Sequence, residues 1–477
     1  MPSVAPRPRI VPDSYVLLSN WRYIEHSILR IIAGWGRCAG DWEDKLAVAN
    51  HVWLQAEIVD RMRRRLDMFP GGKPDAAVNE VFERIVNAVL MAPSWNDAMA
   101  GLHDVLNPLL VRAYSDYMAA SHPVHDRPTH DLLREIIEYK RQQRAWYEDF
   151  RQRHPHHINT NHKQKIEAEL GALNGRLDRV VEASDEVAAY CGKNVDFKMP
   201  ITPGRVKNWD KAPNVFPLLE CDWNRSVESR RLFFMIGYCW EMGVCEQQLR
   251  WIYHAEFMPW QYIHAEARHM WDESRHGNSG YTRLRDFGLD FEHFGYSSYG
   301  AKGEGNLPPM TPKDVYEAFY GVTQIAEKGY FTTKRYCFED FANHGDDASA
   351  EMMQFDIIDE TSHVEYGRIW LEEMAQRAGV NEDYRKRGDI DRAAAQKKSD
   401  HRVGMMRKIL AGHNPDPSEM NDPQHGGECV NPGSVPAVDD LRNPQTHGHY
   451  QWLLQHLREQ LPLKNIDEAP ARPNLPM

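Results

Sequence analysis

The pattern Asp-Glu-x-x-His occurs twice in this chain, at residues 272–276 and 359–363. Both copies lie within long stretches whose apolar residues recur at helical spacing. Residues i and i+3 of a helix share one face, with Cβ atoms about 5–6 Å apart, so the glutamate and histidine of one copy can bind the same metal ion. Two copies on facing helices can bind two ions. The repeated pattern therefore favours a helical bundle built around a metal centre.

Helical periodicity dominates the rest of the chain, whereas alternating β-branched runs closed by Asn-Gly or Asp-Gly turns are nearly absent. We therefore expect an all-α fold. In the N-terminal third, the helices are expected at about 19–33, 41–68, 75–121 and 128–152. In the second half, they are expected at about 226–256, 259–287, 312–343 and 347–376.

Loops rich in proline, glycine and polar residues divide these helices into consecutive segments. The expected segments are an N-terminal helical domain at 1–155, a helix and irregular connection at 156–225, a four-helix bundle with both patterns at 226–380, and a C-terminal helix with an extended polar tail at 381–477. Single helices are expected at 163–192 in the connection and at 398–411 before the tail. The histidine-rich tract 154–162 is typical of a solvated linker.

A site for two ions needs two further carboxylates, one from each remaining helix of the bundle. Glu327 precedes Glu360 by 33 residues in a mostly uncharged stretch of the third helix. The first helix offers Glu241, 32 residues before Glu273, and Glu246, 27 residues before it. In an antiparallel pair, residues equally distant from the turn lie at the same height. This argument favours Glu241 and leaves Glu246 as the alternative.

An aspartate stands four residues before each histidine, Asp272 before His276 and Asp359 before His363. A metal-bound histidine usually donates its second ring N–H to a carboxylate or carbonyl, which fixes the tautomer and the orientation of the ring. Each aspartate could accept from the histidine of its own helix or from that of the facing helix. We expect both aspartates to orient the histidines rather than to bind the ions.

The alternative reading of these residues is four charged helices whose carboxylates face solvent. That reading has to account for Glu241 between Trp240 and Met242, and for Glu327 in the apolar stretch after Ile325. A buried carboxylate without a partner is costly, and a bound cation removes that cost. The repeated pattern, with a glutamate 32 or 33 residues ahead of each copy, therefore favours the dimetal site.

Residues 226–376 resemble the ferritin-like di-iron carboxylate superfamily, in its oxygenase and oxidase branch. The stretch MPWQYIHAEARHMWDESRH is similar to the second bundle helix of uncharacterised ferritin-like proteins and of the tRNA-hydroxylase type. The resemblance implies a four-helix bundle that holds two iron ions, or one manganese and one iron, with O₂ as co-substrate. It implies metal ligands at Glu241, Glu273, His276, Glu327, Glu360 and His363.

The N-terminal third is similar to a diverged pair of such helices. Glu25 stands 32 residues before Glu57, the same spacing again, but Asp60 rather than a histidine follows Glu57 at i+3. In a later helix, Glu135 is followed at i+3 by Glu138. Because this third keeps no Glu-x-x-His pattern, we expect a second, metal-free bundle that serves packing, dimerisation or coverage of the metal domain. A helical domain of unrelated origin is the alternative.

Composition limits the kinds of partner and the cellular compartment that we expect for this protein. The net charge of −12 argues against a nucleic-acid partner, which would require a basic face. No apolar run approaches the ~18 residues of a membrane helix, and the first residues lack the apolar core of a secretory signal. Seven scattered cysteines without a CxxC pair fit reduced thiols. We therefore expect a cytoplasmic protein without a membrane partner, with a homodimer as one option.

Together these features predict a non-haem di-iron oxygenase or oxidase, such as a monooxygenase, that hydroxylates, N-oxygenates or desaturates a small organic substrate. No flavin or nicotinamide motif is visible, so an external reductase or ferredoxin would supply electrons. An Mn/Fe ligand-binding oxidase and an iron-handling ferritin-like protein are alternatives with the same ligand types. A metal-free structural or partner-binding protein is the third alternative.

Overall fold

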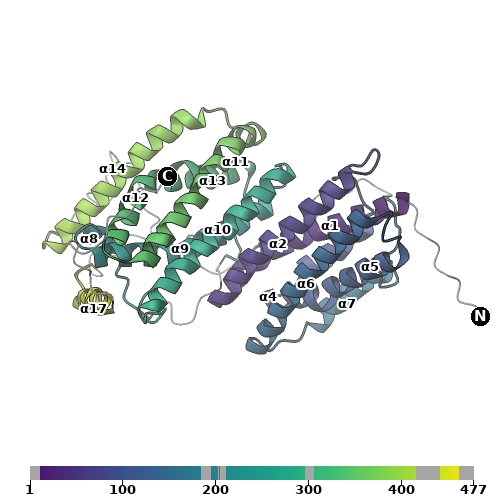
Figure 1. Ribbon diagram of the computed structural model, residues 1–477, viewed down its shortest axis with the longest axis horizontal. Helices are drawn as coiled ribbons and strands as arrows, with labels where there is room; N and C mark the ends of the chain where they lie inside the picture. Colours follow the sequence, from purple (N-terminus) through teal and green to yellow (C-terminus); the bar gives the residue numbers. More distant parts are fainter. Residues whose placement is uncertain are drawn as a thin grey trace, which may run out of the picture. The chain divides into compact units, whose positions relative to one another are not determined.

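The computed structural model describes residues 11–183, 195–201, 204, 211–295, 306–414 and 441–460 (Figure 1). Every regular element in these ranges is a helix, and the one pairing of extended backbone there is an isolated bridge between Pro200 and Asn306. The all-α fold expected from the sequence is therefore confirmed for the described part of the chain.

The chain forms two compact units, which are described separately. Unit 1 consists of Met1–Gly204, Glu246–Trp271 and Ala301–Pro309, and unit 2 of Arg205–Cys245, Asp272–Gly300 and Met310–Met477. The boundaries fall inside α9 (Val227–His254) and α10 (Trp260–Asp286), so each of these helices contributes to both units. The units interleave along the chain, whereas the sequence predicts four consecutive segments.

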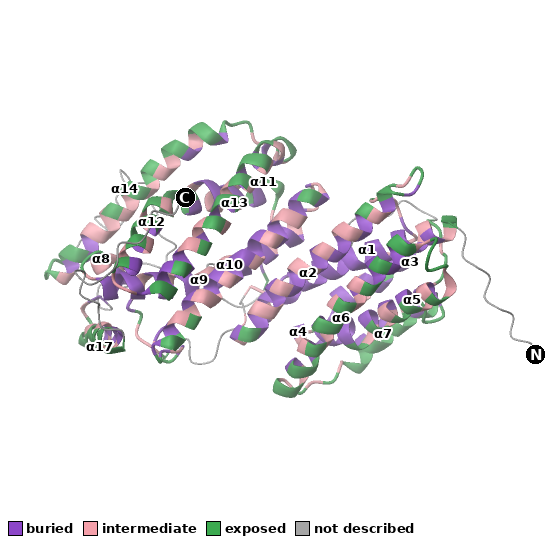
Figure 2. Cartoon of the chain, viewed as in Figure 1, coloured by how far each residue is buried: buried purple, intermediate pink, exposed green. Residues whose placement is uncertain are grey.

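Unit 1 is organised around its first helix, which is buried at every position from Leu17 to Trp35 (Figure 2). The edges of Tyr114 and Tyr117 pack against Trp21 of this helix, with ring centroids 5.0 and 5.6 Å away. The helices of unit 1 outside α9 and α10 are α1 (Val11–Trp35), η1 (Gly36–Cys38), α2 (Trp42–Asp67), α3 (Glu80–Leu90), α4 (Trp95–Ala100), the π-helical η2 (Gly101–Leu106), α5 (Asn107–Ala120), α6 (Arg127–Arg153) and α7 (Thr160–Gly171).

Two helices expected in this unit are shorter than the sequence suggested. The helix expected at 75–121 is broken after Leu90, and a new one starts where the Ser94 hydroxyl accepts a hydrogen bond from the backbone N–H of Asp97 at 3.1 Å. The helix expected at 163–192 ends at Gly171 and is followed by a turn with Gly175 in the left-handed region. Its last expected residues, 184–192, lie outside the described ranges.

The described residues between 226 and 378 follow the sequence expectation closely. The four helices expected there agree with α9, α10, the run from α11 to α12, and α13 to within about two residues at each end, the usual uncertainty of helix ends. Beyond the shared helices α9 and α10, unit 2 contains α8 (Phe216–Asp222), α11 (Pro312–Tyr320), the π-helical η3 (Gly321–Ala326), α12 (Glu327–Asn343), α13 (Asp347–Ala378), α14 (Tyr384–Leu410) and α17 (Pro444–Gln460).

The C-terminal part differs from the expectation in two ways. The helix expected at 398–411 is the second half of α14, which begins at Tyr384 behind an Asp383 cap that accepts from two backbone N–H groups. Within the tail expected to be extended, residues 444–460 form α17, with Tyr450, Leu453 and Leu457 buried on one face. The remaining tail, 415–440 and 461–477, lies outside the described residues.

Glycines let α9 and α10 approach closely inside unit 2. A Cβ added at Gly280 would meet the carbonyl oxygen of Met235 at 2.5 Å and Cβ of Tyr238 at 2.7 Å, so only glycine fits there. Gly277 lies one turn earlier against the backbone N of Met242, where an added Cβ would be 3.3 Å away. This contact fixes the height of α9 against α10 next to Asp272–His276.

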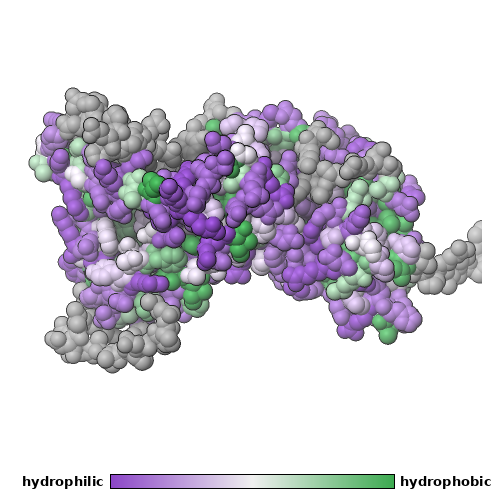
Figure 3. All heavy atoms as spheres, turned by 90° about the horizontal axis from the view of Figure 1, so that it is seen from above, coloured by the Kyte–Doolittle hydropathy of each residue, from purple (hydrophilic) through white to green (hydrophobic). Residues whose placement is uncertain are grey.

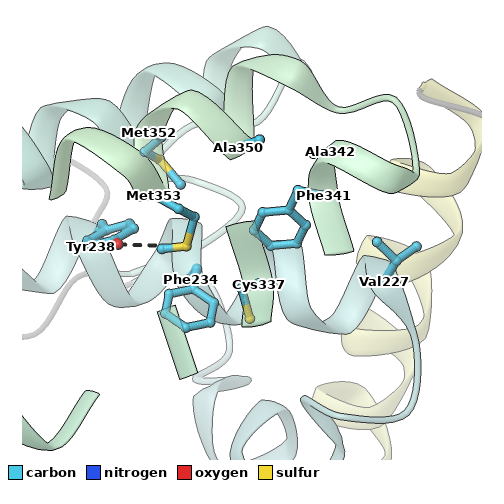
Figure 4. Close-up of a cluster of buried hydrophobic side chains, with 9 residues drawn as sticks. All are labelled: Val227, Phe234, Tyr238, Cys337, Phe341, Ala342, Ala350, Met352 and Met353. Carbon is cyan, nitrogen blue, oxygen red and sulfur yellow. Dashed lines mark hydrogen bonds between the residues drawn. The ribbon is translucent and has the colours of Figure 1, made fainter. Parts of the chain in front are cut away.

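A cluster of buried apolar side chains ties α9, α12 and α13 together (Figure 4). Its members are Val227, Phe234, Tyr238, Cys337, Phe341, Ala342, Ala350, Met352 and Met353. The hydroxyl of Tyr238 is directed to the sulfur of Met353 at 3.8 Å. Burial of apolar area of this kind stabilises the fold by roughly 25 cal/mol per Å². The cluster thus holds the three helices in register beside the residues described next.

The described helices can be judged by the length and apolar character of a membrane span, and the surface by its hydropathy. The face drawn in Figure 3 is largely hydrophilic, with hydrophobic residues scattered among charged ones. Among the residues that the structure describes, no helix has both the length and the apolar character needed to cross a bilayer.

Candidate metal centre

Unit 2 brings the sequence-predicted ligands together in two groups. Within each group, one oxygen or nitrogen atom per residue can be chosen so that all of them lie within 4.8 Å of one another. The first group contains Glu273 from α10, Glu327 from α12 and His363 from α13. The second group contains Glu241 from α9, His276 from α10, and Asp356 and Glu360 from α13. All six residues expected to bind metal therefore belong to one group or the other.

The first group is centred on His363, which is fully buried. Its Nδ1 lies 3.3 Å from Oε1 of Glu273 and 3.4 Å from Oε1 of Glu327. Both glutamates are buried as well, at 3% and 6% exposure. Two carboxylates and one imidazole from three helices thus converge on one point, which is the arrangement that a small divalent ion needs.

The second group is centred on His276 in the same way. Its Nδ1 lies 3.4 Å from Oε2 of Glu241 and 3.4 Å from Oδ1 of Asp356. Glu360 stands one turn after Asp356 on α13 and completes the group. Glu241 is the most open of these residues, with 20% of its side chain exposed, whereas the other three are at 5% or less.

The two predicted aspartates lie on the far sides of the histidine rings. Nε2 of His276 is 3.2 Å from Oδ2 of Asp359, and Nε2 of His363 is 3.3 Å from Oδ2 of Asp272. Each aspartate therefore reaches the histidine of the facing helix rather than its own. Arg275 donates to both aspartates and links the two pairs. With Nε2 directed to a carboxylate, each ring presents Nδ1 to its own group of ligands.

The alternative first-helix ligand, Glu246, is engaged elsewhere. Its Oε1 accepts a hydrogen bond from Nζ of Lys45 at 2.8 Å, and both side chains are 3% exposed. This ion pair satisfies the carboxylate within unit 1, whereas Glu241 lies beside His276 in unit 2. Distance from the turn between the two helices favoured Glu241 in the sequence, and the geometry of the structure favours the same residue.

Three residues of the centre were missed in the sequence. Asp356 lies one turn before Glu360, and the Asp-x-x-x-Glu spacing on one helix face could have indicated it. His269 lies one turn before Glu273 on α10 and offers a further ligand atom near it. Lys334 lies two turns after Glu327 on α12, and no ligand pattern in the sequence indicates a lysine there.

Lys334 contributes a positive charge inside the second group. Its Nζ lies 2.8 Å from Oε1 of Glu360 and 2.9 Å from Oδ1 of Asp356, and the residue is only 4% exposed. The Tyr238 ring is also near, with its centroid 5.7 Å from Nζ. Buried charges persist in proteins when they are paired and hydrogen-bonded, and these contacts fulfil that condition for Lys334.

Two of the carboxyl groups, those of Glu241 and Glu360, have raised pKa values and are protonated more readily here than in water. Loss of water raises the pKa of Glu241 to about 8; His276 opposes this rise and Glu273 adds to it. Burial likewise raises the pKa of Glu360 to about 7, although Lys334 opposes the rise. For His276, burial lowers the pKa, but the charges of Asp356, Asp359 and Glu241 outweigh it and leave the pKa raised. A dense group of buried acids thus favours cations of any kind.

The donor set and its unsatisfied atoms fit a pair of divalent transition-metal ions. Buried Oε2 atoms of Glu241 and Glu360 accept no hydrogen bond, and Nδ1 of His276 takes part in none. Carboxylate oxygens with imidazole nitrogens are the ligands that iron, manganese and zinc accept in proteins. A cation bound between these atoms would satisfy them together.

Several residues of unit 1 occupy the same positions along their helices as candidate ligands do in unit 2. Glu25 lies fourteen residues after the first residue of α1, as Glu241 does in α9. Gln55 lies thirteen residues after the first residue of α2, as Glu273 does in α10. The first position holds a glutamate in both units, whereas the second holds a neutral amide in unit 1 and a carboxylate in unit 2.

Two further helices of unit 1 also carry residues at the positions of candidate ligands in unit 2. Lys140 lies thirteen residues after the first residue of α6, as Glu360 does in α13. Asn107 directly follows a six-residue π-helical segment, as Glu327 does. Because four helices agree in position, we treat unit 1 as a structural counterpart of the ligand-bearing part of unit 2.

A lysine occupies the centre of unit 1 where unit 2 has a ligand. Nζ of Lys140 lies 2.6 Å from Oε2 of Glu25 and 3.2 Å from Oε1 of Gln55, and the Tyr114 hydroxyl donates to Oε1 of Glu25 at 2.6 Å. Gln55 also donates to Glu25. The buried carboxylate is therefore satisfied by an ammonium group and neutral donors.

Of the glutamates singled out for this region in the sequence, Glu25 lies in that centre, whereas Glu57 and Glu135 lie away from it. Glu57 is paired with Arg61 at 3.4 Å and lies 2.7 Å from Nε2 of His264. Glu135 accepts from the same Arg61 at 2.6 Å and is 40% exposed. The 32-residue spacing from Glu25 therefore selected the wrong residue on α2, two positions beyond Gln55.

One further acidic group near the histidine-rich tract already has its cation. Asp41, Asp44 and His154 lie close enough to share an ion. However, the guanidinium of Arg153 donates to Asp41 at 2.8 Å and to Asp44 at 2.6 Å. This group therefore reads as an ion-pair network that joins the end of α6 to the start of α2.

Comparison with known proteins adds no relative: no protein-family model, curated protein or solved structure matches the chain.

Proposed function

We propose that unit 2 is a ferritin-like four-helix bundle that holds two iron ions and catalyses an O₂-dependent oxidation of a small organic substrate. The observation that carries this proposal is the pair of buried histidines, His276 and His363. Each presents Nδ1 to carboxylates of its own group and Nε2 to an aspartate of the facing helix. A solvated charged helix face would not require two such matched arrangements.

Each group would hold one ion. Glu273, Glu327 and His363 would bind the first, and Glu241, His276, Asp356 and Glu360 would bind the second. Two ferrous ions supply electrons to O₂ when bound, and an Mn/Fe pair would use the same ligand types. Asp272 and Asp359 would hold the imidazoles in one tautomer, with Arg275 between them. An external donor would return the electrons.

The substrate would approach from the side of Glu241, the most exposed ligand candidate. Its neighbour Trp240 donates its indole N–H to the carbonyl of Gly295 at 3.1 Å and packs on Phe216, with ring centroids 4.1 Å apart. An aromatic wall beside an open ligand suits a substrate with an apolar or aromatic body. The more enclosed residues of the centre would exclude bulk water from the ions.

Anaerobic loading followed by an O₂ pulse tests this proposal. We expect the chain to take up two Fe²⁺ ions, to consume O₂ in proportion to bound iron, and to develop ferric absorption within seconds. His276→Ala should abolish the response. His264→Ala is the matched control, because His264 is paired with Glu57 outside both groups. Equal O₂ uptake by His276→Ala and the unchanged protein would contradict the proposed centre.

A further inference from the structure

Lys334 stands inside a complete set of candidate metal ligands, which is an unusual place for an ammonium group. It follows Glu327 by seven residues on α12, so both side chains leave the same face of the helix. Its Nζ contacts Glu360 at 2.8 Å and both carboxylate oxygens of Asp356 at 2.8 and 2.9 Å. Both partners belong to the second group of ligands, centred on His276.

A metal ion in the second group would share the two carboxyl groups that Lys334 contacts, those of Glu360 and Asp356. An ammonium and a divalent ion bound to the same two carboxylates would repel each other strongly at this distance, because little water screens them. The lysine and the ion therefore compete for Glu360 and Asp356. His363, the centre of the first group, contacts Glu273 and Glu327 instead, so this competition concerns one of the two groups.

We propose that the ammonium of Lys334 is the resident cation of the second group, and that a metal ion enters there only by displacing it. This inference rests on the proposed dimetal centre and adds an order of loading. The first ion binds at Glu273, Glu327 and His363, and the second binds more weakly at Glu241, His276, Asp356 and Glu360. A chain short of metal would thus hold one ion, with the ammonium of Lys334 paired to Glu360 and Asp356 in the second group.

The side chain of Lys334 is of a kind that an ion can displace. A lysine has a flexible four-carbon stem and a compact charge, so it can leave a carboxylate by rotation about its own bonds. The ring of Tyr238 lies 5.7 Å from Nζ and can attract the ammonium through its π face.

Lys140 of unit 1 provides the contrast. Both lysines are almost fully buried and ion-paired with a glutamate, at 2.6 Å for Lys140 and Glu25 and at 2.8 Å for Lys334 and Glu360. Lys140, however, occupies a position that corresponds to a ligand, whereas Lys334 is additional to a full ligand set. Lys140 is thus a permanent substitute for a metal, and Lys334 is a displaceable one.

Titration of the metal-free full-length chain with Co²⁺ tests the inference, with heat and visible absorption as readouts. We expect two binding steps, the second at least ten-fold weaker than the first. His276→Ala should remove the weaker step and His363→Ala the stronger one. In Lys334→Met, the second step should tighten by roughly ten-fold or more, because a competing charge is gone. Lys140→Met, the matched control, should leave both affinities unchanged.

Thermal unfolding separates competition from a purely structural role. Lys334→Met should lower the midpoint of the metal-free protein, and saturating Co²⁺ should cancel most of the difference. Lys140→Met should lower the midpoint equally with and without Co²⁺. Lys334→Gln, which keeps a hydrogen-bond donor, repeats the affinity measurement if the methionine variant does not fold.

Three outcomes would overturn the inference. Two equal Co²⁺ affinities that Lys334→Gln leaves unchanged would reject the order of loading and keep the dimetal centre. A loss of the second ion on removing Lys334 would mean that the lysine supports the site rather than competes for it. If the unchanged chain binds no Co²⁺, both the inference and the proposed function fail.

Discussion

Nε2 of His276 lies 3.2 Å from Oδ2 of Asp359 on the facing helix. This contact fixes which ring nitrogen points at the second group of ligands, because the acceptor holds the proton on Nε2 and leaves Nδ1 free to bind metal. Asp359 itself touches Arg275 on the outer side, so its charge is balanced without a metal. In the proposed centre, the pair would therefore act on ligand orientation alone.

Asp359→Asn should weaken binding of the second ion by about 10–100-fold, the usual cost of losing such a contact. Asp272→Asn should do the same to the first ion, since it faces His363. Titration with Co²⁺ measures both effects. Asp290→Asn is the control, because Asp290 is a half-exposed partner of His293 outside the centre. Unchanged affinity in Asp359→Asn would show that this aspartate does not orient the ligand.

Gly280→Ala should destabilise the fold. The added Cβ would lie 2.5 Å from the Met235 carbonyl oxygen, so α9 and α10 would have to separate, at a cost of about 1–3 kcal/mol. Gly404→Ala on α14 is the matched control, because nothing lies within 4 Å of an added Cβ there. Removing a helix glycine should stabilise the protein by about 0.5–1 kcal/mol. Urea unfolding measures both, and equal shifts would contradict the close contact.

Glu25 and Lys140 should be strongly coupled in a double-mutant cycle. Lys140→Met leaves the Glu25 carboxylate buried without its ammonium, which should cost about 3–5 kcal/mol of unfolding free energy. Glu25→Gln combined with Lys140→Met removes both charges and should recover most of that loss. Urea unfolding of the single and double variants gives the coupling energy. Additive effects would mean that the two side chains do not interact in solution.

His51 should make unit 1 sensitive to acid. Burial, with a smaller effect from Lys140, lowers its pKa to about 3, and its surroundings are the rings of His103 and Trp146. Its pKa is depressed on folding, so the unfolded chain binds the extra proton between pH 6.5 and 3, and stability falls as the pH falls through that window. From pH 7 to pH 5 the loss should be about 2 kcal/mol for this group.

Comparison with His51→Phe isolates the contribution of this histidine. The variant should lose about 2 kcal/mol less than the unchanged chain between pH 7 and pH 5, because its residue 51 binds no proton in either state. Urea unfolding at the two pH values provides the difference. His26, whose pKa burial also lowers, remains in both proteins and cancels. Equal losses in the two proteins would mean that His51 is protonated in the folded state.

The sequence indicated the helices of unit 2 and six members of the two groups because both follow from spacing. The 3.6-residue period reveals helices, and Glu-x-x-His reveals two residues on one face. Asp356 was missed because an acidic residue four positions before Glu360 is common on solvated faces. Lys334 was missed because a search for ligands ignores cations, although a lysine can hold the same oxygen atoms.

Unit 1 shows where spacing alone misleads. Glu57 repeats the 32-residue distance from Glu25, yet Gln55 faces Glu25 in the buried centre. Gln55 and Lys140 could be matched to unit 2 only after the structure showed where each helix begins. An amide and a lysine form no ligand pattern in the sequence. Tertiary packing, which decides which side of α2 faces inward, lies beyond local sequence rules.

The metal content of the purified chain tests the central claim most directly. Elemental analysis should find about two transition-metal ions per chain, one for each of the two groups of carboxylates and histidines. Glu241→Gln and His363→Ala should each lose metal. Glu246→Gln should retain it, since Glu246, which lies on the same helix as Glu241, is paired with Lys45 of α2. Fewer than one ion per chain after metal-supplemented preparation, with no further loss in His363→Ala, would contradict the account.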